Sequence, residues 1–343
     1  MSRIKVAAAG ALAGWAIMRL LSGPRRYEFN GKTVLVTGGS RGLGLVLAKQ
    51  LAAEGARVAI CGRDAEALER ARSTLEAIGG EVFALPVDVV DRNAVDTLVR
   101  QLAARFGPVD VLVNNAGVIE VGPAETMTLA DYQEAMAVNF WGVVHPTLAV
   151  LPAMRERRQG RIVNIISIGG RLGVPHLVPY SASKFAALGF SQGLRAEERR
   201  RGVIVTSVVP GLMRTGSPRN ATFRGRHRAE YAWFSIADSL PGLTIGAEEA
   251  ARRILEGVRR GDAEVRFPLV TRLAVIAAAV APNVTASVLE LTGRLLPEAP
   301  ADLRGRQPGR ESQSAASPSW LTRLGDDAAR RYNQIAPSEG ASA

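Results

Sequence analysis

A tyrosine and a lysine four residues apart form the pair with the clearest potential for chemistry. Tyr180 and Lys184 stand in the segment YSASK, which has the pattern of a helix. Because positions i and i+4 lie on one helix face, the ammonium would favour the phenolate. That cation, with a positively charged cofactor ring, would lower the phenol pKa from its usual ~10. Such a tyrosine could exchange a proton near neutral pH, although a surface helix can carry the same pair by chance.

A glycine-rich turn lies near the start of the chain. The sequence TGGSRGLG at residues 37–44 follows the apolar run 34–36 and precedes the helix-like stretch 45–51. A strand, a glycine turn and a helix in this order form the context of a dinucleotide-binding loop. Gly38 would permit the tight turn, Gly42 would let the backbone approach a pyrophosphate, and Gly44 would allow close helix packing. Glycine turns also occur in ordinary loops, so this motif alone is weak.

Strand-like runs alternate with helical patterns along most of the chain. This alternation predicts an α/β fold with a doubly wound, right-handed parallel sheet of the Rossmann type between two helical layers. Ligands of such sheets bind at the carboxyl ends of the strands. The predicted strands are residues 33–36, 58–61, 82–85, 109–113, 162–166 and 204–209.

Taken in order, these motifs resemble the short-chain dehydrogenase/reductase family, and the resemblance extends from about Asn30 to Phe267. It implies an oxidoreductase that interconverts a carbonyl and an alcohol by hydride transfer with a nicotinamide cofactor. The matching positions are the glycine loop, Asp88, the sequence NNAG at 114–117, Asn139, Ser167, Tyr180 with Lys184, and Pro210-Gly211 followed by Thr215.

The resemblance assigns catalytic roles to four residues. Tyr180 would give a proton to the carbonyl oxygen, and Ser167 would hydrogen-bond the same oxygen. Lys184 would lower the tyrosine pKa and hold the nicotinamide ribose, while Asn139 would hold a water leading from the lysine to solvent. Ser167 could instead be an ordinary strand-end serine, and Asn139 could cap or kink its helix.

The end of the second strand bears on the choice of cofactor. Gly62 stands where an NAD-binding carboxylate would fall, Arg63 follows it, and Arg41 lies in the glycine loop. Two guanidiniums favour a 2′-phosphate, so we expect NADP(H). Alternatively, Arg63 is a solvated charge and Asp64 serves as a displaced acid for NAD(H). The resemblance also implies cofactor contacts at Gly38, Ser40, Arg41, Gly42, Leu43, Gly44, Arg63, Asp88, Val89, Asn115, Ala116, Gly117, Tyr180, Lys184, Pro210, Gly211 and Thr215; the 114–117 segment could also stabilise a turn.

Length and composition limit which domain organisations, sites and partners are possible. The chain has 343 residues, more than a typical ~250-residue α/β domain, so appended segments are expected. Cys61 is the only cysteine, which excludes an intrachain disulfide. His145, His176 and His227 are scattered, so no metal site is expected. The net charge of +11 is compatible with binding of nucleic acid, but the sequence contains no nucleic-acid recognition module. We therefore expect no nucleic-acid partner.

The segment between Thr215 and Gly246 should determine the substrate. It is first basic and then aromatic, at Tyr231, Trp233 and Phe234. The aromatic side chains could line a pocket for a bulky, lipophilic carbonyl compound, or they could pack this segment, a lid over the site, onto the body. The cationic residues could attract an anionic headgroup or the phosphopantetheine of an acyl carrier, or they could only solvate a loop; they are Arg214, Arg219, Arg224, Arg226, His227 and Arg228.

The chain is divided by composition into an apolar N-terminal segment (1–27), the catalytic domain (28–268), an apolar or amphipathic helical extension (269–298) and a tail (299–343). The run at residues 6–18 is a membrane-associating helix or an alanine-rich helix packed on the body. Export is not expected, because an NADP-dependent enzyme needs the cytosolic cofactor pool; we therefore expect a cytoplasmic protein, with membrane attachment left open.

The extension and the tail differ in character. Apolar residues at 273–281 and at 284, 288, 291 and 295 would dock on the body, on a dimer mate or on an anionic membrane. Residues 299–318 are rich in Pro, Gly, Ser and Arg, which predicts disorder, and a short helix is expected between 320 and 332. A homodimer or homotetramer through helices near 131–157 and 181–201 is implied by the resemblance. A silent NADP(H)-binding regulator of the same fold is the alternative function.

Overall fold

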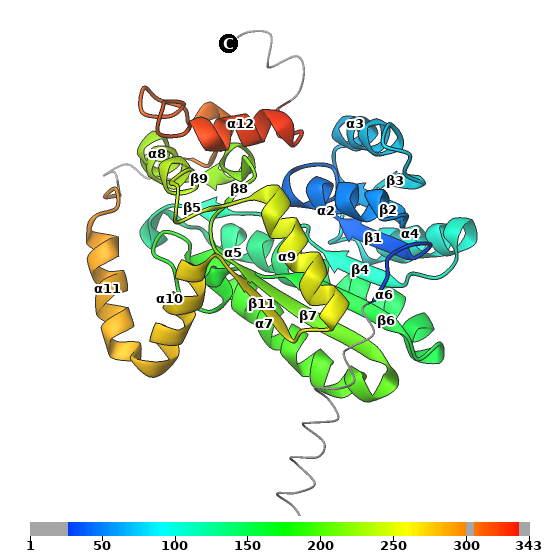
Figure 1. Cartoon of the computed structure of the whole chain (residues 1–343). Helices are drawn as coiled ribbons and strands as arrows, with labels where there is room; N and C mark the ends of the chain where they lie inside the picture. The colour runs from blue at the N-terminus through cyan, green and yellow to red at the C-terminus, as the bar shows by residue number, and fades with distance from the viewer. Residues whose placement is uncertain (1–26, 300–304, 336–343) are drawn as a thin grey trace, which may run out of the picture.

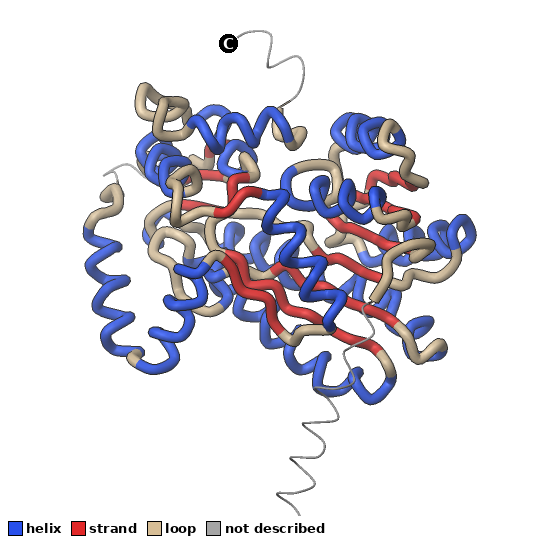
Figure 2. Tube along the Cα trace, viewed as in Figure 1, coloured by secondary structure: helices blue, strands red, loops and turns tan. Residues whose placement is uncertain are grey.

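The centre of the molecule is a seven-stranded parallel sheet in the order β11-β7-β6-β4-β1-β2-β3 (Figures 1 and 2). The computed structural model describes residues 27–299 and 305–335. Strand order reverses between β1 and β4, which is where open α/β sheets bind ligands. The strands are β1 (Thr33–Thr37), β2 (Arg57–Gly62), β3 (Val82–Pro86), β4 (Val111–Asn114), β6 (Gly160–Ile165), β7 (Val203–Pro210) and β11 (Glu264–Phe267).

Helices cover both faces of this sheet and enclose two hydrophobic cores. Strands β1, β2, β4, β6 and β7 are buried on both sides, which explains their continuous apolar sequences. One face packs on α2 (Gly42–Ala53), α3 (Ala65–Glu76) and α9 (Ala247–Arg260). The other packs on α4 (Arg92–Phe106), α6 (Gly142–Glu156) and α7 (Val178–Glu198), and α5 (Leu129–Met136) packs on α7. The expected three-layer, doubly wound fold is confirmed.

The six predicted strands are all present, with ends shifted by one or two residues. Strand β11 was not predicted. It has only four residues, EVRF, and alternates polar with apolar because it is an edge strand that pairs with β7 alone. Its signal is therefore too short and too polar to stand out from the sequence.

The segment between β7 and α9 forms the lid over the carboxyl edge of the sheet. It contains β8 (Met213–Arg214), a 3-10 turn (Ser217–Asn220), β9 (Thr222–Phe223), α8 (His227–Ala237) and β10 (Ile245–Gly246). Strand β9 pairs with β5 (Glu120–Val121) on one side and with β12 (Gln307–Pro308) on the other. The lid is thus tied both to the catalytic domain and to the C-terminal part of the chain.

Helices α10 (Leu269–Val280) and α11 (Pro282–Arg294) form a hairpin that projects from the body at the left of Figure 1. Helix α11 has no buried residue, and α10 buries only Thr271 and Val275. The apolar side chains predicted to dock are therefore largely exposed within the described chain.

The tail differs from the expected disorder in residues 305–318. This part contains β12 and a 3-10 turn (Gly309–Glu311), and it is followed by α12 (Arg323–Arg331). The order has a tertiary cause, because β12 pairs with β9 and Arg306 forms an ion pair with Glu134. The short helix expected between 320 and 332 is present. The expectation for residues 6–18 lies outside the described residues.

Candidate active site

A cavity of about 1090 Å³ opens at the carboxyl edge of the sheet, where β1, β2, β4, β6 and β7 end. It brings together nearly all of the residues that the sequence singled out. Two of them, Gly44 and Asn139, do not line it but lie behind its wall. The predicted residues that do line it are Gly38, Ser40, Arg41, Gly42, Leu43, Arg63, Asp88, Val89, Asn115, Ala116, Gly117, Ser167, Tyr180, Lys184, Pro210, Gly211 and Thr215.

Ser167 and Tyr180 face each other in this cavity. Ser167 follows β6, and its hydroxyl accepts a hydrogen bond of 3.0 Å from the Gly169 N–H. This contact leaves the serine proton free to donate. The Tyr180 phenol lies within hydrogen-bonding reach of the Ser167 side chain. Tyr180 is fixed by its place in the first turn of α7, which begins at Val178 with Pro179.

Lys184 lies one turn further along α7, as its spacing from Tyr180 predicts. Its Nζ is buried, donates to the Ile165 carbonyl at 3.0 Å and lies 5.7 Å from the centre of the Tyr180 ring. Burial lowers the pKa of Lys184 to about 8. The lysine therefore carries its charge at neutral pH and loses it under mildly alkaline conditions.

The pKa of Tyr180 differs from the sequence-based expectation. Burial raises it to about 12, and the hydrogen bond with Ser167 offsets only part of that rise. The groups of the protein alone thus keep the phenol protonated at neutral pH. A protonated phenol is the form that can donate to a carbonyl oxygen, so the geometry suits reduction without any lowering of the pKa.

Asn139 sits in a π-helical turn, Ala137–Trp141, between α5 and α6. Its amide accepts from the Val118 N–H and donates to the Val118 carbonyl and the Ser183 hydroxyl, each at 3.0 Å. A Cβ added at Gly117 would lie 2.9 Å from Asn139 Oδ1 and 3.6 Å from Lys184 Nζ. The missing side chain at Gly117 therefore keeps the space between Asn139 and Lys184 open. The helix is irregular at Asn139, as the alternative interpretation of this residue allowed, and the water relay stays a prediction.

The glycine loop has the conformation that its sequence requires. Gly38 and Gly42 have φ values of 63° and 55°, in the left-handed region that disfavours other residues. A Cβ at Gly44 would lie 2.2 Å from the Gly38 carbonyl oxygen, so only glycine lets α2 approach the loop. The Asn115 side chain donates to the carbonyls of Thr37 and Gly38, both at 3.1 Å. Asn115 thus stabilises the turn, which is the second role considered for it.

The two arginines expected at the adenosine end differ in their surroundings. Arg41 donates to Asp64 at 2.8 Å and to Asn220 at 3.0 Å. The Ala67 N–H and the guanidinium of Arg41 hold the pKa of Asp64 below its usual range, and Asp64 caps α3. Arg63 is exposed beside them and has no side-chain partner among the described residues. Asp64 is therefore already engaged, whereas Arg63 is open to an anion.

The lid aromatics divide between the two roles considered for them. Tyr231 is buried against Phe223, whereas Trp233 lines the cavity, and Phe234 does both. Glu230 fixes this arrangement, because it is buried and accepts from the Trp233 indole at 2.7 Å while contacting His176 Nδ1 at 2.9 Å.

His145 contacts the Val89 carbonyl, and His227 contacts the Ser312 hydroxyl. No group of metal-binding side chains occurs among residues 27–299 and 305–335.

Sequence reasoning missed several residues of the cavity because they come from distant segments. Val270 and Leu289 reach it from the α10–α11 hairpin, Asn220 from the lid, and Gln334 from the end of the described chain. Glu120, which does not line the cavity, was also missed. It is buried with both carboxylate oxygens lacking partners, burial raises its pKa to about 7, and its charge raises that of Tyr180. No local motif marks any of these positions.

Comparison with known proteins agrees with this site. Residues 32–223 match the short chain dehydrogenase family. The chain is 34% identical over 280 residues to a fatty acyl-CoA reductase of Acinetobacter baylyi, covering 81% of this chain and 90% of that protein. It is 38% identical over 247 residues to a putative ketoacyl reductase of Streptomyces coelicolor, covering 69% and 93%.

Among solved structures, the chain resembles a variant of actinorhodin polyketide ketoreductase with NADPH, with a TM-score of 0.62 and 33% identity over 70% of this chain and 97% of that one. Levodione reductase gives a TM-score of 0.60 and 27% identity over 69% and 96%. The protein belongs to the short chain dehydrogenase family. It is an oxidoreductase that acts on CH–OH groups and the corresponding carbonyls.

Proposed function

We propose that the protein is an NADP(H)-dependent reductase of lipophilic ketones or aldehydes. The observation that carries this proposal is the placement of Ser167, Tyr180 and Lys184 together on the wall of one large cavity at the strand ends. The same cavity extends over the glycine loop to Arg63, so one continuous space of about 1090 Å³ is open to a dinucleotide and a second compound.

The residues present fit an NADP-type cofactor. The left-handed glycines and the start of α2 suit a pyrophosphate, since N–H groups at a helix N-terminus attract anions. The open guanidinium of Arg63, with Arg41 beside it, suits a 2′-phosphate. Asp88 and Val89 would border the adenine, and Pro210, Gly211 and Thr215 would flank the nicotinamide. When bound, the reduced cofactor supplies a hydride to the carbonyl carbon.

The side chains of the protein supply the remaining steps. Ser167 donates a hydrogen bond to the carbonyl oxygen and holds it beside Tyr180. Tyr180 gives its phenolic proton to that oxygen as negative charge develops there, and the carbonyl compound becomes the alcohol. The cation of Lys184 stabilises the resulting phenolate. Asn139 and the open space at Gly117 lead from the lysine toward solvent, from which the proton is replaced.

A lipophilic substrate is supported by the walls of the cavity. The substrate side is lined by Leu172, Leu177, Trp233, Phe234, Leu243 and Leu289. Such side chains stabilise an apolar compound by removing its surface from water. The relatives named for fatty acyl-CoA and ketoacyl reduction agree with this class.

The experiment is NADPH consumption with a panel of long-chain ketones, aldehydes and acyl thioesters. Wild-type protein should oxidise NADPH with at least one lipophilic carbonyl compound and release the alcohol. Tyr180→Phe should lose most of this activity, on the order of 10²-fold or more, while still binding NADPH. Equal turnover by the two proteins would contradict the proposed role of the phenol.

We also propose that the α10–α11 hairpin rests on a membrane surface. Val284, Val288, Leu291 and Leu295 are 57–80% exposed on the same hairpin that contributes Val270 and Leu289 to the cavity. A lipophilic substrate could therefore pass from lipid to the site along one apolar path. Among the described residues, one helical stretch, 129–156, is long and apolar enough to cross a membrane, and half of its most apolar window is buried in the body.

Sedimentation with anionic vesicles tests this docking. Replacing Val284 and Leu291 by serine should reduce vesicle binding, whereas Ile78→Ser, an exposed apolar residue elsewhere, should not. Equal binding by both variants would contradict the role of the hairpin.

For the oligomer, exposed Trp141, Leu148 and Phe185 on the α6–α7 side support a dimer. Phe185→Glu should then shift the molar mass measured by light scattering toward that of a monomer. An unchanged mass would contradict this interface.

A further inference from the structure

The end of the described chain contacts the glycine loop that follows β1. Residues 328–334, here named the C-terminal strap, comprise the last turn of α12 and the three residues after it. In Figure 1, α12 lies above β8 and beside α8, and its C-terminal end approaches α2. The Tyr332 carbonyl accepts a hydrogen bond of 2.9 Å from the Gly42 N–H, at the first residue of α2. The strap therefore contacts the loop assigned above to the pyrophosphate.

Asn333 fixes the strap to the same loop through its side chain. Its amide nitrogen donates to the carbonyls of Ser40 at 2.8 Å and Ala67 at 2.9 Å, and its oxygen accepts from Arg70 at 2.9 Å. Asn333 has a φ of 58°, which asparagine tolerates better than most residues. These contacts hold the glycine loop and the start of α3 in one arrangement.

Gln334 reaches across the cavity to the lid. Its amide nitrogen donates to the Thr215 carbonyl at 3.1 Å, and its oxygen accepts from Asn220 at 2.6 Å. A Cβ added at Gly42 would lie 2.8 Å from Gln334 Nε2. Gln334 thus lies between the glycine loop and Thr215, the two sides between which the pyrophosphate and nicotinamide would be held.

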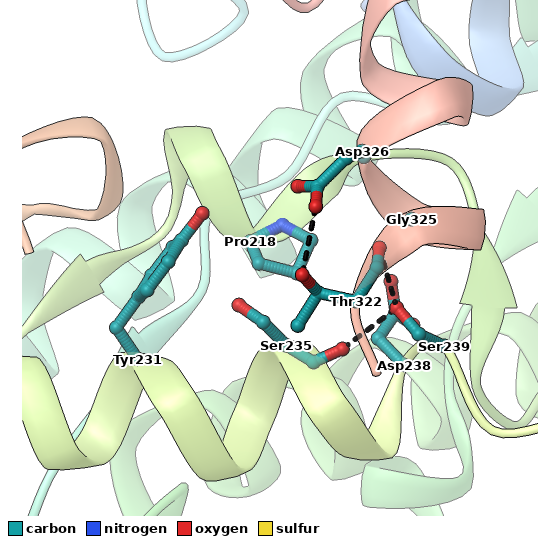
Figure 3. A pocket seen from close by; sticks show the side chains of 9 residues that line it. Pro218, Tyr231, Ser235, Asp238, Ser239, Thr322, Gly325 and Asp326 are labelled. Carbon is teal, nitrogen blue, oxygen red and sulfur yellow. Dashed lines mark hydrogen bonds between the residues drawn. The ribbon is translucent and has the colours of Figure 1, made fainter. Parts of the chain in front are cut away.

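The strap is firmly seated rather than loosely attached. Tyr332 and Ala328 are part of the main hydrophobic core. A Cβ at Gly216 would lie 2.4 Å from Ala329 Cα, so the lid backbone and α12 are in direct contact. Figure 3 shows the preceding turn against α8, where the Ser239 hydroxyl contacts the carbonyls of Ser235 at 2.9 Å and Thr322 at 3.3 Å. The cavity left there is about 10 Å³, too small for a ligand.

We propose that the C-terminal strap is a part of the cofactor site, and that Gln334 is a positioning residue which holds the glycine loop and the lid together over the bound pyrophosphate. The proposal rests on the proposed NADP(H) function. The strap caps the Gly42 N–H through Tyr332 and leaves the next donor, the Leu43 N–H, and the Ser40 hydroxyl for the phosphates. Closing the loop against the lid should slow the release of the cofactor.

The test is NADPH binding, followed by its fluorescence, with dissociation measured by stopped flow. Truncation after Arg331 removes residues 332–343, among them the strap residues 332–334, and should raise the dissociation constant and the off-rate by on the order of tenfold or more. Truncation after Ile335 keeps the strap and should leave both unchanged. Unchanged binding after the first truncation would overturn the proposal. Tighter binding would also overturn it, because it would mean that the strap competes with the cofactor for the site.

Point variants keep the test decisive if the shorter chain fails to fold. Gln334→Ala should weaken NADPH binding several-fold, and Gln334→Glu should weaken it further, because a carboxylate of the same size would face the pyrophosphate. The control Arg323→Ala lies outside the strap and its side chain is 81% exposed, so it should bind as wild type. Equal affinities for wild type, Gln334→Ala and Gln334→Glu would overturn the role of Gln334. Failure of the wild type itself to bind NADPH would instead contradict the proposed function.

Discussion

The Lys184 Nζ lies 5.7 Å from the centre of the Tyr180 ring and gives its hydrogen bond to the Ile165 carbonyl. In the proposed mechanism the lysine therefore acts on the tyrosine through its charge, and that charge depends on a buried ammonium whose pKa is lowered to about 8. The pKa of Tyr180 is about 12, so the phenol stays protonated throughout the range in which the lysine titrates.

We therefore expect carbonyl reduction to decline as the pH rises through about 8, where Lys184 loses its proton. The measurement is kcat/KM for the carbonyl substrate between pH 6 and 10, which reports the ionisation of the free enzyme. In Lys184→Arg the charge persists at high pH, so the residual activity of this variant should lack the decline. A decline of the same shape in both proteins would assign it to another group.

The same residue should affect stability in the opposite direction. The unfolded chain keeps the lysine proton up to ~10.4, whereas the folded protein loses it near 8. Between these values the unfolded state binds more protons, so the contribution of Lys184 to the free energy of unfolding should increase with pH. Urea unfolding of wild type and Lys184→Met at pH 7.5 and 9.5 measures this change. An equal difference between the two proteins at both pH values would contradict it.

Replacement of Arg63 should change the preference between cofactors. Arg63 is exposed and unpartnered within the described chain, and it lines the cavity beside Arg41. Arg63→Asp should raise the dissociation constant for NADPH at least about tenfold, since a charge-assisted hydrogen bond is lost and a like charge is gained. Binding of NADH should change little. Arg100→Asp, on the exposed surface of α4, provides the control, and equal losses for NADPH and NADH in Arg63→Asp would refute a phosphate-binding role.

Gly44→Ala should destabilise the fold, because the new methyl group would meet the Gly38 carbonyl oxygen at 2.2 Å. Forcing a backbone shift in a packed region costs about 1–3 kcal/mol. Thermal and urea unfolding should show this loss together with weaker NADPH binding. Gly173→Ala is the matched control, since no atom lies within 4 Å of the added Cβ there. A wild-type melting temperature for Gly44→Ala would show that the loop relaxes freely.

Asn139→Ala separates a structural role from a relay role. The substitution leaves the Val118 N–H and carbonyl without their partner, so the free energy of unfolding should fall by about 1–3 kcal/mol. If Asn139 also leads protons to Lys184, kcat should fall at least about tenfold at a temperature where circular dichroism shows a folded protein. A normal kcat in that folded variant would leave only the structural role.

The sequence predicted the central fold well because parallel strands carry their own signal. Each of β1, β2, β4, β6 and β7 is buried on both faces, so each appears as a continuous apolar run between helical patterns. The glycine loop could be predicted equally well, because positive φ values and the close approach of the backbone both require glycine. These constraints are local, so they determine the residue types at neighbouring positions and can be recognised in the sequence.

The rest of the site depends on contacts between distant segments. The ion pair of Arg41 with Asp64, the raised pKa of Tyr180 and the order of residues 305–318 all arise from tertiary packing. Gln334 belongs to a polar stretch with no motif, and only the fold places it beside Thr215. The juxtaposition of Ser167, Tyr180 and Lys184 was thus predictable from spacing, whereas the electrostatics of the site and the contact of Gln334 with the lid were not.

The hydrogen bond from Gly42 to Tyr332 joins residues 290 positions apart, and this separation bears on biosynthesis. Domains begin to fold from their N-terminal side while translation proceeds. The glycine loop is synthesised first, and its backbone partner Tyr332 follows 290 residues later. A ribosome-bound fragment ending before Tyr332 would therefore expose the nucleotide cleft with the Gly42 N–H at the start of α2 uncapped, and the seating of the strap would be a tertiary docking event that follows folding of the sheet.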